Sequence, residues 1–145
     1  MKRMNRRDLF SMVAAAVMLI LVAGCGSSGP RSGTVFFTDG SPVRSGSIEF
    51  RNVKDKQRFA GRIDTEGGFV PASDGGRVGL PPGDYEVVVV QIVLTEDLAL
   101  AQHSHGGTVP RRYADYYTTD LRHTVKSGDT DPVKIVVEAE KVDEE

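Results

Sequence analysis

The chain has 145 residues, a formal net charge of −2, one cysteine and no tryptophan. This length suits one domain, and a single cysteine excludes an internal disulfide, a four-thiolate zinc site and a Cys-x-x-Cys redox pair. The nearly balanced charge provides no basic face for nucleic acid, while 16 Gly and 7 Pro favour a turn-rich β fold over a helical bundle.

Residues 1–24 have the pattern of an export signal. Basic side chains are concentrated in the first seven positions, and residues 9–23 are apolar apart from Ser11. This apolar run is short for a membrane span, which needs about 20 residues, and it fits the apolar region of a signal peptide. Residues 6–10 also resemble part of a twin-arginine export motif, and the alternative is an ordinary positive segment.

The signal ends in Leu21-Val22-Ala23-Gly24-Cys25, which resembles a bacterial lipobox. The resemblance implies cleavage between Gly24 and Cys25, a diacylglyceryl group on the Cys25 sulfur, and acylation of the new N-terminus, as with palmitate. Several acyl chains hold a protein on a bilayer more firmly than one. The alternative is that Cys25 is a small buried apolar residue. Gly26 is not the aspartate of an inner-membrane retention signal, so we expect the outer membrane, periplasmic or surface face, where a cell has one.

Cleavage would make the remaining protein more acidic. Residues 1–24 contain four of the 18 Lys and Arg and one of the 20 Asp and Glu, so their removal changes the net charge from −2 to −5. This balance disfavours nucleic acid and charge-driven binding to anionic lipid. Residues 25–33, rich in Gly and Ser, are predicted to be a flexible tether. A β-sandwich domain is expected at 34–140 and an acidic tail at 141–145.

Short strand signals separated by Gly and Pro turns recur through the predicted domain. The alternation at 46–51 and 58–64 places Ile48, Phe50, Phe59 and Ile63 inward. The run Val87 to Val90 is typical of a central strand covered on both faces. The pattern predicts a seven-stranded antiparallel sandwich. Strands are expected at 34–38, 46–51, 58–64, 85–94, 121–126 and 132–139, with a return strand starting at 69 after a hairpin turn at 64–68.

Four motifs in order carry a family resemblance: Gly33-Thr34-Val35, Gly46-x-Ile48-x-Phe50, Asp64-x-x-Gly67-x-Phe69 and Leu80-Pro81-Pro82-Gly83-x-Tyr85-x-Val87. The series resembles the carboxypeptidase regulatory-like domain, which implies a transthyretin-like, immunoglobulin-like sandwich. With Val109-Pro110-x-x-Tyr113, the chain is similar to short planctomycete-type predicted lipoproteins. The resemblance covers about residues 33–139. Such domains are usually non-catalytic, so the resemblance implies a fold and leaves the function open.

Residues 95–120 exceed a normal connection between strands and form the candidate functional insertion. Glu96 to Gln102 could form a short helix. Aromatic and basic side chains gather in this insertion, and such rings and guanidinium groups can stack on sugars or contact acidic polymers. The alternative is that the tyrosines pack on the edge of the sandwich. The candidate residues are Arg111, Arg112, Tyr113, Tyr116 and Tyr117.

His103-x-His105 is the best candidate for a metal site, because alternate residues of a strand share one face. A third ligand would be needed, such as His123 or Asp115, and the alternative is two solvated loop histidines. Asp64-x-Glu66 fits a turn better than a calcium site, because the EF-hand spacing is missing. We expect neither metal nor cofactor.

An enzyme is the least favoured interpretation. Hydroxyisourate hydrolases share the transthyretin-like fold and have a His/Arg site closed by a C-terminal Tyr-Arg-Gly-Ser, whereas this chain ends in residues Val142-Asp143-Glu144-Glu145. The sequence therefore predicts a lipid-anchored envelope protein with a non-catalytic sandwich that acts structurally or by binding. The alternative is a module that binds envelope polysaccharide or a protein partner through residues 95–120.

Overall fold

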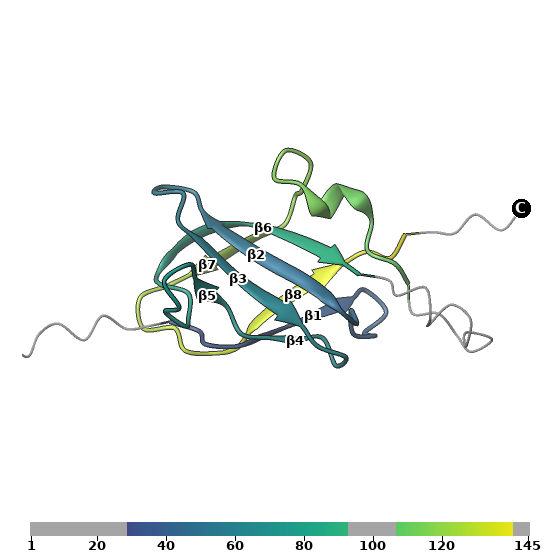
Figure 1. Cartoon of the computed structure of the whole chain (residues 1–145), viewed down its shortest axis with the longest axis horizontal. Helices are drawn as coiled ribbons and strands as arrows, with labels where there is room; N and C mark the ends of the chain where they lie inside the picture. The colour runs from purple at the N-terminus through teal and green to yellow at the C-terminus, as the bar shows by residue number, and fades with distance from the viewer. Residues whose placement is uncertain (1–28, 93–106, 141–145) are drawn as a thin grey trace, which may run out of the picture.

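The computed structural model describes residues 29–92 and 107–140, which are mostly strands in two sheets that do not form a closed barrel (Figure 1). The sheets lie in two layers with the hydrophobic core between them. The smaller sheet has the order β4 (Gly68–Phe69), β1 (Gly33–Phe37), β8 (Val133–Val137). The larger sheet has the order β5 (Ala72–Ser73), β3 (Arg58–Ile63), β2 (Gly46–Asn52), β6 (Gly83–Gln91), β7 (Arg122–Val125).

Period-2 alternation places the core as predicted. Ile48, Phe50, Phe59 and Ile63 are all buried, because alternate residues of a strand point to the same face. The rings of Phe50 on β2 and Phe69 on β4 lie 5.7 Å apart between centroids, so they join the two sheets. Further core residues come from both layers: Val35, Phe37, Val43, Leu80, Tyr85, Val87, Val89, Tyr113, Val125, Val133, Ile135 and Val137.

The prediction of seven antiparallel strands is wrong in two respects. First, eight strands are present among the described residues, because the return strand bends at Val70 and Pro71 and changes sheets. Its first half, β4, pairs with β1, and its second half, β5, pairs with β3. Proline has no N–H for a ladder, so a strand readily breaks there. Second, β1 and β8 run parallel, from Gly33 opposite Val133 to Phe37 opposite Val137.

The turn at residues 64–68 forms as expected, although it does not join two paired strands. One carboxylate oxygen of Asp64 accepts hydrogen bonds from the main-chain N–H groups of Glu66 and Gly68, both at 2.8 Å. This is the geometry of an Asx turn. Because β4 continues into the smaller sheet while β3 belongs to the larger one, the turn carries the chain from one layer to the other.

The central strand is β6, which lies between β2 and β7. Val87, Val88 and Val89 are buried, so the strand is covered on both faces over these three residues, as predicted. Val90 is 40% exposed, so the cover ends before it. The cover on the outer face comes from the segment after residue 106, which contains the short 3-10 helix η2 (Arg111–Ala114).

The chain packs on the sandwich earlier than the tether prediction of 25–33 implies. Gly29 and Pro30 are buried, and the carbonyl of Pro30 accepts a hydrogen bond of 3.0 Å from the N–H of Leu80. Gly29 has φ +57°, and a Cβ there would collide with the Leu80 carbonyl. Only glycine meets both conditions without strain.

The chain enters the described structure at one end of the sandwich, and the two sides of the 93–106 gap lie at the other end (Figure 1). Gly33 and Val133 begin their paired strands at the Gly29 end. Gln91 ends β6 at the opposite end, where its side-chain oxygen accepts a 2.9 Å hydrogen bond from the N–H of Val109. Gln91 and Val109, on either side of the gap, therefore lie at the end remote from Gly29.

Candidate functional site

The described part of the insertion, residues 107–120, lies on the outer face of the larger sheet. The hydroxyl of Thr119 is buried and donates a 2.8 Å hydrogen bond to the carbonyl of Val87 on β6. The same hydroxyl accepts a hydrogen bond from the N–H of Leu121 at 3.2 Å. These two hydrogen bonds offset the free-energy cost of burying the hydroxyl. The segment is thus fixed to β6, with Val88 covered beneath it.

Tyr113 belongs to the core and is not available to a ligand. Its side chain is 3% exposed and joins the main hydrophobic cluster. The guanidinium of Arg112 lies over its ring at 4.5 Å from the centroid and donates hydrogen bonds to the Tyr113 hydroxyl and to the carboxylate of Glu138. Tyr113 thus packs within the core, and Arg112 is engaged with Tyr113 and Glu138. Arg111 is exposed on η2.

Tyr116 ties the insertion to strand β2. Its hydroxyl donates a 2.8 Å hydrogen bond to a carboxylate oxygen of Glu49, and the guanidinium of Arg51 lies 3.8 Å from the centre of its ring. Burial, with the hydrogen bond to the carboxylate, raises the pKa of the Tyr116 hydroxyl well above its ordinary value. The phenol therefore stays protonated and keeps donating through the ordinary pH range.

Tyr117 points into solvent. Its side chain is 97% exposed. The main chain around it is nevertheless held in place, because the N–H of Tyr117 donates to the Asp115 carboxylate at 2.8 Å, and the N–H of Thr119 donates to the Asp115 carbonyl at 2.9 Å. The ring is thus a solvent-facing aromatic surface on an ordered turn.

Four charged side chains form a row across the outer face beside these tyrosines. In the pairing register Arg58 on β3 lies opposite Arg51 on β2, Arg51 opposite Glu86 on β6, and Glu86 opposite Arg122 on β7. Adjacent strands are about 4.8 Å apart, so the row extends about 14 Å. We refer to these four residues as the arginine row.

The centre of the arginine row is a close ion pair. Nε and Nη2 of Arg51 donate to the same oxygen of Glu86, at 2.9 and 2.7 Å. The hydrogen bond from Arg51 holds the pKa of the Glu86 carboxyl below its ordinary value, and the same bond raises the pKa of Arg51. Charge-assisted bonds of this kind are stronger than neutral ones, so Arg51 and Glu86 satisfy each other.

Arg58 and Arg122, at the two ends of the arginine row, are paired less closely with carboxylates than Arg51 is. Arg58 is 3.8 Å from Glu49, beyond hydrogen-bond distance, and its side chain is 56% exposed. Arg122 is 4.0 Å from Glu86 and 54% exposed. Its Nη1 donates to the carbonyls of Thr119 and Leu121, at 3.2 and 2.8 Å, which fixes its direction. Both guanidinium groups can therefore donate hydrogen bonds to an anionic ligand that approaches from solvent.

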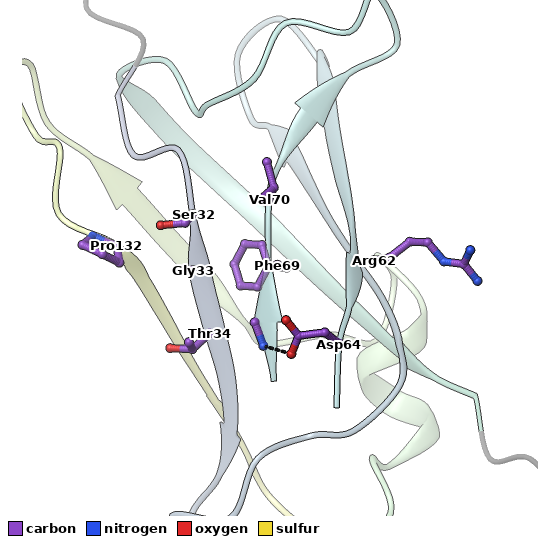
Figure 2. Close-up of a pocket in the computed structure, with 9 residues that line it drawn as sticks. Ser32, Gly33, Thr34, Arg62, Asp64, Phe69, Val70 and Pro132 are labelled. Carbon is purple, nitrogen blue, oxygen red and sulfur yellow. Dashed lines mark hydrogen bonds between the residues drawn. The ribbon is translucent and has the colours of Figure 1, made fainter. Parts of the chain in front are cut away.

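A second surface feature is an open groove of about 620 Å³ beside β4 and β1 (Figure 2). Gly33, Phe69, Val70 and Pro132 give it a mainly apolar lining. Arg62 also lines the groove, and Figure 2 shows its guanidinium group pointing away from Phe69. The Asp64 carboxylate at its border is already bonded to main-chain N–H groups of its own turn, so its role is to shape that turn.

The other predicted sites are either outside the described residues or structural. Gly24, Cys25, His103, His105 and the predicted helix at 96–102 lie outside them. His123, the proposed third metal ligand, lies on β7 with its ring 6.3 Å from that of Phe50, and burial lowers its pKa. Asp115 shapes the turn at Tyr117. Within residues 29–92 and 107–140, no group of three His, Cys, Asp or Glu side chains could hold a metal ion.

Comparison with known proteins finds no matching family model, no curated protein and no solved structure. In the described part of the chain, none of the helices has the length and apolar character needed to cross a bilayer. The structure brings Tyr116 and Tyr117 together with the arginine row and separates them from Arg112 and Tyr113. The sequence did not identify Arg58, Glu86 and Arg122 as part of a site, since only strand pairing joins them to Arg51.

Proposed function

We propose that this protein is a lipid-anchored protein of the cell envelope whose non-catalytic sandwich, of the transthyretin-like type, acts by binding. The binding surface is the outer face of the larger sheet, made by Tyr116, Tyr117 and the arginine row, which we call the tyrosine-arginine face. The observation that carries the proposal is Tyr117, a ring 97% exposed on a hydrogen-bonded turn, next in sequence to Tyr116, whose ring contacts Arg51 of the arginine row.

Pre-organisation supports this surface as a binding site. A ligand that contacts a mobile loop loses affinity because it must order that loop. Here Thr119 bonds to β6 and Tyr116 bonds to β2, so the segment that bears Tyr117 is held at both strands. A tyrosine ring then offers a flat apolar contact with a polar tip at small entropic cost.

The lipobox and the packing of Gly29 together support a short anchor. Cys25 precedes Gly29 by four residues, and an extended chain covers at most about 3.5 Å per residue, so a lipidated Cys25 would lie within about 14 Å of the sandwich. The Gly29 end would then face the bilayer. The residues on either side of positions 93–106 would face away from it, because they lie at the opposite end.

The non-catalytic part of the proposal has its support in the sequence. The motif series from Gly33 to Val87 resembles the carboxypeptidase regulatory-like domain, and such domains are usually non-catalytic. A measurable turnover of hydroxyisourate by the purified chain, above a heat-denatured control, would overturn this part of the proposal.

The anchor is tested by Cys25→Ser in the full chain. Cells grown with an alkyne-labelled fatty acid should incorporate label into the wild-type protein and none into the variant, and the variant should leave the membrane fraction. Ser28→Ala serves as the control, because it changes a neighbouring residue and leaves the lipobox intact. A Cys25→Ser protein that is still labelled and still membrane-bound refutes the anchor.

Binding is tested by capture of envelope polysaccharide and peptide fractions on the full chain in detergent micelles. Tyr117→Ala should reduce capture by about threefold to tenfold, since aromatic contacts contribute about 0.5–1.5 kcal/mol. Lys134→Gln, an exposed change on β8 of the other sheet, should leave capture unchanged. Equal capture by wild type and Tyr117→Ala would refute the tyrosine-arginine face as the site.

A further inference from the structure

We infer that the ligand of the tyrosine-arginine face is an acidic polysaccharide. Its acidic groups would pair with Arg58 and Arg122, and a sugar ring would stack on Tyr117. This inference rests on the binding function proposed above and adds the chemical class of the ligand.

The charge of the face differs from that of the chain. The arginine row has three arginines and one glutamate, a net charge of +2, and the outward charges beside it, Glu49, Arg62 and Asp84, bring the total to +1. The whole sequence has a net charge of −2. A positive surface on an acidic protein concentrates anionic ligands there by long-range attraction.

The guanidinium groups at the two ends of the row have donors to spare. Each arginine carries five N–H donors. Among the described residues, Arg58 makes no hydrogen bond through its side chain, and Arg122 uses only Nη1. A carboxylate can receive two parallel N–H bonds from one guanidinium, which is the strongest pairing available at an exposed site. Two separate arginines, on β3 and β7, suit a ligand with repeated acidic groups.

Other features of the face favour a sugar polymer over an acidic peptide. Peptides commonly add a strand to a free sheet edge, but most of this face lies over β3, β2 and β6, whose ladders are already paired, and of the arginine row Arg122 alone is on the edge strand β7. Between the charges, Ala60 lies opposite Glu49, and Ser47 lies between Arg62 and Val90, which is 40% exposed. The flat exposed ring of Tyr117 is suited to the face of a sugar.

The test compares three polymers on the full chain in detergent micelles by isothermal titration calorimetry. Polygalacturonate has carboxylates and sugar rings, dextran has sugar rings alone, and polyglutamate has carboxylates alone. Polygalacturonate should bind most tightly, and its affinity should fall as salt is raised, because exposed charges are screened. Arg58→Gln should weaken it by about twofold to fivefold, and Tyr117→Ala by about threefold to tenfold. The control Lys134→Gln removes a charge from the opposite sheet and should have no effect.

The two variants distinguish the stacking contact of Tyr117 with a sugar ring from the ionic contact of Arg58 with a carboxylate. Tyr117→Ala should leave weak polyglutamate binding unchanged, whereas Arg58→Gln should reduce it. Polyglutamate binding as tight as polygalacturonate would overturn the inference in favour of an acidic peptide, and equal dextran binding would overturn the role of charge. If polygalacturonate does not bind while envelope material is still captured through Tyr117, the ligand class is wrong and the binding function stands. If polygalacturonate does not bind and envelope material is not captured through Tyr117, the ligand class and the binding function are both wrong.

Discussion

The three tyrosines of residues 107–120 should respond very differently to truncation. Tyr113 is 3% exposed, and burying a tyrosine covers about 150–250 Å². At about 25 cal/mol per Å², this burial amounts to about 4–6 kcal/mol, close to the cost of about 3–5 kcal/mol seen when large aromatic core residues become alanine. Tyr117 is 97% exposed, so Tyr117→Ala should change the free energy of unfolding by no more than about 0.5 kcal/mol.

Urea unfolding of the full chain, followed by circular dichroism, measures this contrast. Tyr113→Ala should move the midpoint to much lower urea or leave the chain unfolded, because a domain of this size has only about 5–15 kcal/mol of stability. Tyr113→Leu keeps most of the apolar volume and should cost about 1–2 kcal/mol, so it gives a measurable transition. Equal midpoints for Tyr113→Ala and Tyr117→Ala would refute the division of these residues into core and surface.

Two further perturbations test the packing and the protonation state of the sandwich. Gly33→Ala should destabilise by about 2 kcal/mol or more, because its Cβ would lie 2.7 Å from the Val133 carbonyl and closer still to the Phe69 ring. Gly75→Ala, which meets nothing nearer than 3.9 Å, is the matched control, and an equal loss in both would contradict the packing. Burial lowers the pKa of His123 in the folded state below its ordinary 6.5, so stability should fall as pH decreases from about 6.5 towards that lower value. His123→Gln should flatten this part of the stability profile measured by thermal unfolding, and an unchanged slope would show that His123 is not responsible.

Local patterns predicted the strands and their inward faces well. The alternation around Ile48 and Phe50 is a property of consecutive residues, and it needs no knowledge of the partner strands. The change of sheet at Val70 and Pro71 was missed, because it depends on which of two layers offers a free edge. The parallel pairing of β1 with β8 was missed for the same reason, since it joins segments separated by almost the whole domain.

The candidate site was predicted in part. The sequence identified Tyr116 and Tyr117 as aromatic residues beside arginines, but it grouped them with Tyr113, which is buried. Three tyrosines within five residues look alike in a linear sequence, and only the contact of the segment with β6 separates them. The arginine row was also beyond sequence reasoning, because Arg58, Glu86 and Arg122 meet through the strand register.

The parallel pairing of β1 with β8 also governs when the protein can fold. Every hydrogen-bonded contact between these strands joins residues 33–37 to residues 133–137, and such distant contacts require costly closure of a long chain segment. A chain made from its N-terminus cannot complete the smaller sheet until β8 has been synthesised. Until then β1 retains an open edge, so most of the polypeptide must be kept from aggregating while it is still incomplete. Completion of the smaller sheet therefore needs both ends of this domain at once.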